Sequence, residues 1–162
     1  MKKNLGKILT CVGVLLALAA FCMMFVPAAT MEGLFGKTES LSGIDVTFGY
    51  TENKIKLLGV SANIVTYILL LAGIACSVLA FLGKGGKIVC IVAAACFVVA
   101  GVFFFCSIAF ISAYPEMDAG VAKDKLVESL KECLSLGAGS IVGGILSILA
   151  GVAAAAPVFL KK

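Results

Sequence analysis

The sequence predicts an all-α membrane protein: a four-transmembrane-helix bundle with a small extracytoplasmic β-hairpin and a short amphipathic helix. Two observations lead to this fold class. Of the 162 residues, 62% are hydrophobic, and four long segments contain no charged residue. Each segment reaches the roughly 20 residues that a helix needs to cross the hydrocarbon of a bilayer. Backbone groups in lipid must hydrogen-bond within their own segment, so we expect helices.

The chain is expected to form a single integral membrane domain over residues 1–162. Its spans are predicted at about residues 8–28, 63–83, 88–113 and 138–160. Outer loops are predicted at about residues 29–62 and 114–137. The first apolar run is longer than the roughly 7–15 residues of a signal-peptide core. We therefore favour an uncleaved anchor over a cleaved signal peptide, which would leave three spans.

The lysines predict the orientation. The two ends of the chain and the turn at Lys84–Lys87 hold seven lysines and no acidic residue. The two outer loops hold six lysines and all nine acidic residues. The positive-inside rule then places both termini in the cytoplasm of a multi-pass protein of the cell membrane. Because the lysines are split among distant sites and form no basic stripe, we expect no nucleic-acid partner.

The first outer loop contains an alternating pattern typical of a strand. Ile44, Val46, Phe48 and Tyr50 fall on one face, with polar or small residues between them. A turn at residues 51–53 would lead into a second strand that begins near Ile55. These features predict a β-hairpin, which needs a surface to rest on because a lone hairpin is marginal in water.

The second outer loop has a helical period over residues 121–136. Leu126 and Leu130 lie on its apolar side, and charged residues lie mainly on the other. This pattern predicts a short amphipathic helix. It could lie on the membrane surface, cover the hairpin, or continue into the fourth span.

The fourth span carries small residues at every fourth position: Gly139, Gly143, Ser147, Gly151 and Ala155. Helices in lipid associate through close packing, which small residues permit. We expect this stripe to pack inside the bundle. The alternative is a seam between two copies of the chain.

The composition offers no catalytic, cofactor-binding or metal-binding residues. The chain has no histidine, and its seven cysteines form no CxxC pair. Triads based on histidine, zinc sites and thioredoxin-like redox pairs are therefore unsupported. A disulfide from Cys133 to Cys22 or Cys106 stays open, as does an intermolecular one. The spans also lack the ionisable group that commonly marks a coupled transport pathway.

The order of spans and loops resembles the tetraspan group of claudins and peripheral myelin proteins. Gly33-Leu34-Phe35 is similar to the Gly-Leu-Trp of the claudin loop. The resemblance implies a small sheet that stands on the bundle and mediates contacts between cells or within one membrane. The two cysteines of the claudin loop are missing from residues 29–62, so the resemblance concerns layout. The chain is also similar to small four-span proteins of low-GC Gram-positive bacteria.

These features predict a non-enzymatic integral membrane protein that acts in interaction or assembly in the cell envelope. Its partners would be the lipid bilayer and either a second copy or another membrane protein. The predicted contact residues are Phe48 and Tyr50 in the hairpin and Leu126 and Leu130 in the amphipathic segment; alternatively, these four pack on one another. A channel or facilitator for a small neutral solute is the second hypothesis.

Overall fold

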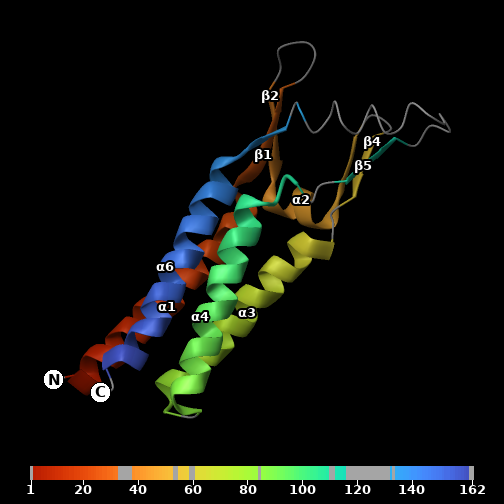
Figure 1. Cartoon of the computed structure of the whole chain (residues 1–162). Coiled ribbons are helices and arrows are strands. Elements are labelled where there is room, and N and C mark those ends of the chain that lie inside the picture. Colours follow the sequence, from red (N-terminus) through yellow and green to blue (C-terminus); the bar gives the residue numbers. More distant parts are fainter. Residues whose placement is uncertain are drawn as a thin grey trace.

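The computed structural model describes residues 2–32, 38–52, 55–58, 61–83, 85–109, 112–115, 132 and 134–160. Four long helices run side by side, and both termini lie at the same end (Figure 1). We call this the terminal end and the opposite one the cap end. The four helices are α1 (Lys2–Cys22), α3 (Ser61–Phe81), α4 (Gly86–Phe105) and α6 (Ala138–Leu160).

All four helices are long and apolar enough to cross a membrane, as predicted. The candidate spans are Leu5–Phe25, Asn63–Phe81, Gly86–Phe105 and Ala138–Phe159. Two predicted boundaries are wrong. The third span ends at Phe105 rather than near residue 113, because the chain turns directly after it. The first span ends at Phe25 rather than near residue 28, because only the 3-10 turn η1 (Met23–Phe25) follows α1. Val26 is extended there, as a residue before proline prefers, and Pro27 starts a strand.

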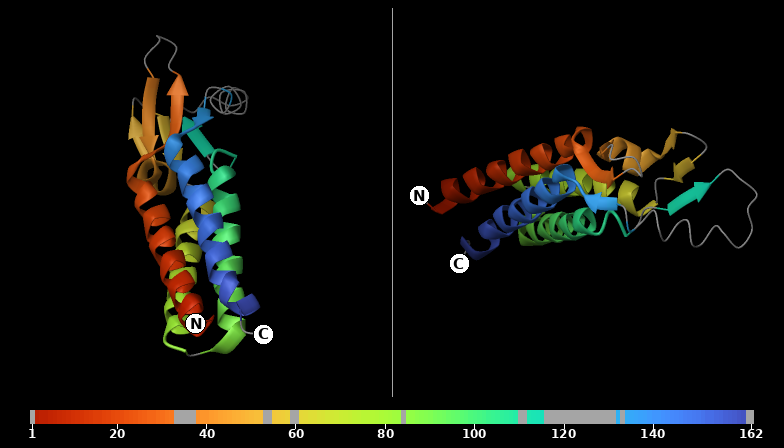
Figure 2. Two further views of the ribbon diagram at one scale, coloured as in Figure 1. Left: turned by 90° about the vertical axis from the view of Figure 1, so that its left-hand side faces the viewer. Right: turned by 90° about the horizontal axis from the view of Figure 1, so that it is seen from above.

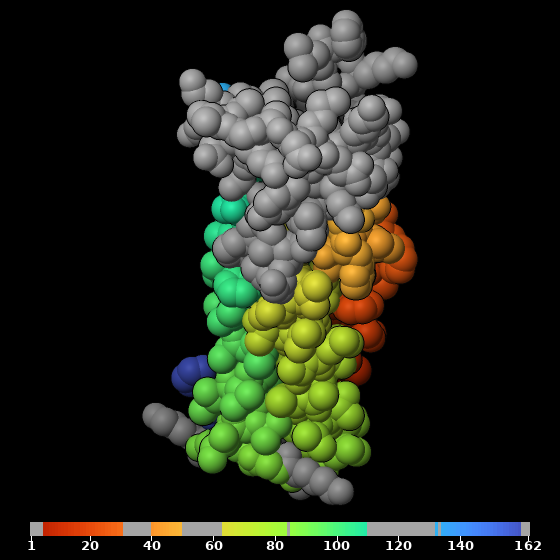
Figure 3. Space-filling view, turned by 90° about the vertical axis from the view of Figure 1, so that its right-hand side faces the viewer, coloured from red at the N-terminus to blue at the C-terminus, as the bar shows by residue number. Residues whose placement is uncertain are grey.

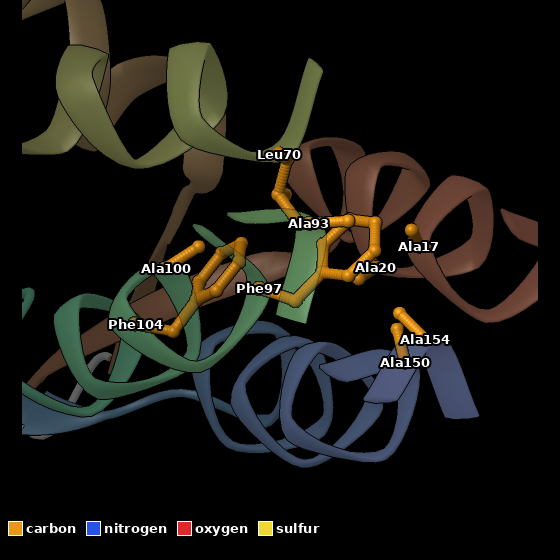
Figure 4. Packing of buried hydrophobic residues seen from close by; sticks show 9 residues of the cluster. All are labelled: Ala17, Ala20, Leu70, Ala93, Phe97, Ala100, Phe104, Ala150 and Ala154. Carbon is orange, nitrogen blue, oxygen red and sulfur yellow. The ribbon is translucent and has the colours of Figure 1, made fainter. Parts of the chain in front are cut away.

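The helices pack so that α6 lies between α1 and α4, while α3 packs on α4 and α1. Their shared core is shown in Figure 4. Phe97 and Phe104 of α4 and Leu70 of α3 supply its large buried side chains. The neighbouring helices contribute mainly alanines: Ala17 and Ala20 from α1, and Ala150 and Ala154 from α6.

Glycines let these helices approach closely. A Cβ atom on Gly101 of α4 would lie 3.0 Å from the Gly144 carbonyl oxygen of α6. One on Gly13 of α1 would lie 3.3 Å from the Ala150 carbonyl oxygen of α6. One on Gly73 of α3 would lie 2.6 Å from the Phe97 ring. Small residues therefore set the helix spacing at three interfaces, as expected where lipid supplies no hydrophobic drive between helices.

The cap end carries two antiparallel sheets of three strands each, in the orders β2-β1-β6 and β3-β4-β5. The first contains β1 (Pro27–Glu32), β2 (Thr38–Ser42) and β6 (Leu134–Leu136). The second contains β3 (Tyr50–Glu52), β4 (Ile55–Leu58) and β5 (Ser112–Pro115). Each sheet thus joins strands from the segment between α1 and α3 with a strand from the segment between α4 and α6. Figure 2 shows the strands gathered beyond one end of the helices.

The predicted hairpin is partly wrong. β3 and β4 do pair, with Tyr50 opposite Leu57. The segment before them is not a strand but the helix α2 (Gly43–Phe48). Ser42 and Asp45 form a capping box at its start, and Gly49 ends it at a φ of 93°. A capping box satisfies free N–H groups of a first helical turn, which favours a helix over the extended alternative.

The predicted amphipathic helix over residues 121–136 falls mostly outside the described residues. Its last part is wrong, because Leu134–Leu136 form strand β6. Leu134 and Leu136 pair with Met31 and Ala29 of β1. The apolar residues that fit a helical face are also spaced for a strand over so short a stretch, and pairing with β1 decides between them.

Candidate functional site

A narrow cleft at the cap end is lined by residues of α2, β1, α3, α4 and α6 and by Ser107, and we call it the junction cleft. Its polar lining consists of Thr47, Asn63, Thr66, Tyr67, Ser107 and Ser140. All of these except Tyr67 are buried. Figure 1 shows α2 at the cap end of the helices, and its residues Gly43, Val46 and Thr47 line the cleft. Six polar side chains thus converge where apolar spans give way to the cap.

Two side chains of α3, those of Asn63 and Tyr67, hold α2. Asn63, at the start of the second candidate span, donates from Nδ2 to the Val46 carbonyl oxygen at 3.2 Å. The Thr47 hydroxyl donates to the Gly43 carbonyl oxygen and is also hydrogen-bonded to the Tyr67 side chain. Gly43 itself leaves no room for a side chain, because a Cβ there would lie 2.9 Å from the Tyr67 hydroxyl. Helix α2 is therefore seated directly on α3.

The other side of the cleft holds β1. The Ser140 hydroxyl of α6 donates to the Ala28 carbonyl oxygen at 3.0 Å and shares a hydrogen bond with the Ser107 hydroxyl at 3.1 Å. The Gly137 amide donates to the same Ala28 oxygen at 2.8 Å. Because buried carbonyl groups are costly unless paired, these bonds stabilise a strand that enters the bundle end.

Aromatic rings close the cleft toward the bundle core. Tyr67 makes edge-to-face contacts with Phe21 and Phe104, at ring-centroid distances of 5.9 and 5.6 Å. The buried Phe97 and Leu70 lie further along the same core. The space in the cleft that the centre of a water molecule could occupy is about 10 Å³. This is roughly enough for one water molecule. Larger solutes do not fit this arrangement.

The chemistry of the junction cleft is hydrogen bonding between neutral groups. Its lining contains hydroxyl groups, one amide, aromatic rings and aliphatic side chains, but no carboxylate, amine or thiol. Within the described ranges, no three His, Cys, Asp or Glu side chains come together. The arrangement can therefore hold backbone segments in place, whereas it supplies neither a general base nor metal ligands.

The small-residue stripe of α6 faces other parts of the same chain. A Cβ on Gly143 would lie 3.2 Å from the Phe104 ring, and one on Gly151 would lie 3.0 Å from Val98. Gly139 lies against the carbonyl groups that lead into β1. Ser147 is buried and donates to the Gly143 carbonyl oxygen at 2.8 Å, and Ala155 is half-buried.

Replacing Gly143 with leucine tests the two predicted roles of the stripe. The larger side chain would collide with the Phe104 ring of α4, so we expect a lower yield of folded protein. Overpacking of this kind costs about 1–3 kcal/mol. Size-exclusion chromatography in mild detergent measures the yield and the oligomeric state. A folded monomer at normal yield, from a wild type that is dimeric, would instead favour a seam between two copies.

The predicted contact residues have different outcomes. Phe48 ends α2 with 68% of its surface exposed, and Tyr50 begins β3. Leu126 and Leu130 lie outside the described residues. The predicted packing of all four on one another is therefore untested, although Phe48 is not enclosed by the parts that the structure describes. The disulfide hypothesis for Cys133 also lies outside them, and the six described cysteines are free thiols.

None of the residues that line the junction cleft is among the predicted site residues. Asn63 was the available signal, since a carboxamide at the start of an apolar run commonly faces other helices rather than lipid. Ser107 and Ser140 carry no such signal, because serines also occur throughout apolar spans. Their meeting across α4 and α6 depends on helix register, which a single sequence does not specify.

No protein-family model, curated protein or solved structure matches the chain. The resemblance to claudins and peripheral myelin proteins therefore stays a prediction about layout.

A matched pair of serine variants tests whether the cleft holds the cap. Ser140 and Ser77 are each 1% exposed on candidate spans, but Ser77 Oγ has no hydrogen-bond partner among the described residues. We expect Ser140→Ala to destabilise the fold by about 1–2 kcal/mol, because it removes a donor to a buried carbonyl group. Ser77→Ala should be neutral or stabilising. Unfolding in mixed detergent micelles measures both, and equal losses would contradict a docking role for Ser140.

Proposed function

We propose that this chain is a non-enzymatic integral membrane protein that acts in interaction or assembly in the cell envelope by presenting its cap in a fixed position. One observation carries this proposal: the junction cleft ties both α2 and β1 to the bundle through buried hydrogen bonds. A flexible loop would lose conformational entropy on binding a partner, whereas a pre-organised surface loses less. A rigid cap therefore suits recognition.

The packing of the bundle supports this proposal over a channel or facilitator. Phe97 is fully buried, and Gly73 is in contact distance of its ring on the facing helix. Tyr67 and Phe104 lie between this core and the junction cleft. A pathway for a neutral solute would have to pass these rings. Liposomes that contain the protein should take up glycerol no faster than empty liposomes, and faster uptake would favour the facilitator hypothesis.

The charge distribution supports a cap that faces outward. Lys7 lies near the terminal end, where its Nζ is 5.8 Å from the centroid of the Phe81 ring. The seven lysines without acidic neighbours belong to the two ends of the chain or to the turn at Lys84–Lys87, so the positive-inside rule places the terminal end in the cytoplasm. A tag fused after Lys162 should then resist protease in intact cells. Cleavage of that tag would overturn the orientation.

Site-specific photocrosslinking in intact membranes tests the interaction. Ser40 is exposed on β2, an edge strand of the first sheet. Edge strands offer unpaired backbone groups to a partner. A photoreactive residue at position 40 should yield a discrete crosslinked species, either a second copy or another membrane protein. The same residue at Ile88, which is exposed at the terminal end, is the matched control.

The dependence on cap docking makes this experiment specific. The crosslink at position 40 should weaken when Ser140→Ala loosens β1 and persist in Ser77→Ala. A crosslink that is equally strong in both variants would show that the partner does not require the docked cap. Recovery of uncrosslinked monomer alone from the protein that carries the photoreactive residue at position 40 would contradict the interaction proposal.

A further inference from the structure

Two phenyl rings at the cap end are largely uncovered. Phe25 in η1 is 70% exposed, and Phe48 at the end of α2 is 68% exposed. Val46 and Thr47 on the same short helix are buried against the bundle. Phe48 lies outside the four candidate spans, so its exposure is not explained by a transmembrane helix that faces lipid. A separate explanation is needed for an apolar ring at this place.

The position of Phe25 follows from the length of the first span. Lys7 marks the terminal end of the apolar region, and Phe25 ends the candidate span Leu5–Phe25. At 1.5 Å per residue, these two side chains are about 27 Å apart along the helix. The hydrocarbon core of a bilayer is about 30 Å thick. Phe25 therefore lies at the boundary between hydrocarbon and headgroups on the cap side.

Helix α2 is held at the same level by two contacts. At its start, the Gly43 amide donates to the Val26 carbonyl oxygen at 3.2 Å, one residue after Phe25. Near its end, the Val46 carbonyl oxygen accepts from Asn63, the first residue of the second candidate span. Figure 3 shows α2 in orange beside the beginning of α3 on this face. Both ends of α2 are thus tied to residues where spans end.

Apolar side chains are also exposed on α3, the helix on which α2 is seated. Directly after Asn63, the side chains of Ile64, Val65 and Ile68 are exposed on α3. On candidate membrane spans, such exposed side chains face lipid. Phenylalanine is one of the apolar residues that interfacial segments bury at the boundary between headgroups and acyl chains.

We propose that Phe25 and Phe48 insert into the boundary layer of the bilayer on the cap side, so that α2 is an interfacial anchor whose partner is lipid. The anchor sets the height of the two sheets above the membrane. The inference depends on the membrane assignment of the helices. It is independent of the interaction proposal, which could fail while the anchor stands.

Single tryptophans test the anchor directly, because the natural chain contains none. We would introduce Phe48→Trp and, separately, Phe25→Trp into protein reconstituted in phosphatidylcholine vesicles. Lipids brominated near the headgroup end or near the chain end of the acyl groups quench tryptophan according to depth. For both variants we expect stronger quenching by the shallow bromines, emission at shorter wavelength than free tryptophan, and weak quenching by aqueous iodide.

Two further variants calibrate the depth scale. Leu15→Trp lies midway along the first span with 61% of the native side chain exposed, so deep bromines should quench it best. Ser40→Trp on β2 should be quenched by iodide and not by brominated lipid. Strong iodide quenching at position 48 would overturn the anchor by placing this ring in water. Protection from both quenchers at position 48 would overturn it in favour of a protein contact. Size-exclusion profiles would verify that each variant is folded.

Discussion

Replacing Gly137 with alanine is expected to loosen the cap strongly, although it adds only one methyl group. Gly137 lies between β6 and α6, and a Cβ there would lie 2.5 Å from the Pro27 carbonyl oxygen and 2.6 Å from the Ala28 carbonyl carbon. These are backbone atoms, which cannot rotate away as a flexible side chain could. The Gly137 amide would also lose its 2.8 Å hydrogen bond to Ala28 if the strands separated.

The expected loss is about 3 kcal/mol, at the upper end for overpacking. Gly6→Ala is the matched control, because among the described residues its Cβ would meet only the Pro157 side chain, at an ordinary 3.7 Å. Alanine is also a better helix former than glycine by roughly 0.5–1 kcal/mol. Unfolding in mixed micelles and limited proteolysis of the cap measure the two variants. Equal stability of Gly137→Ala and Gly6→Ala would contradict the close approach of β1 to α6.

Removing the Phe97 ring is expected to have the other large effect. Phe97 is fully buried, and it lies among Leu70 and the small side chains of the shared core (Figure 4). Phe97→Ala should destabilise the bundle by about 3–5 kcal/mol, because a cavity remains where the ring was. Unfolding in mixed micelles measures the loss. A change below about 1 kcal/mol would mean that the helices collapse around the missing ring.

The partner of this ring supplies a second measurement. Gly73→Ala would place a methyl group 2.6 Å from the Phe97 ring, so it should be destabilising alone. In the background of Phe97→Leu, the smaller side chain leaves room for that methyl group. We therefore expect the double variant to lose less stability than the two single variants lose together. The expected difference is about 0.5–3 kcal/mol. Additive losses would show that the two residues do not share space.

The prediction of α2 as a strand shows where alternation misleads. Ile44, Val46 and Phe48 alternate with polar residues, and this pattern is equally compatible with a short helix whose ends are capped. Ser42 and Asp45 were visible in the sequence as a capping box, three residues apart. Giving the cap more weight than the alternation would have predicted the helix. The second predicted strand is confirmed, because β4 begins at Ile55. The predicted turn at residues 51–53 is wrong in part, because Thr51 and Glu52 belong to β3 and pair with β4.

The number and approximate place of the four apolar helices follow from the sequence alone, because hydrocarbon thickness sets their length and the backbone must bond internally. The spacing of small residues also marked α6 as a helix suited to close packing. The pairing of strands across the two inter-helix segments, and the meeting of Ser107, Ser140 and Ala28 at one end of the bundle, became visible only in three dimensions. Span length depends on local composition, whereas these contacts depend on the register and rotation of helices far apart in the chain.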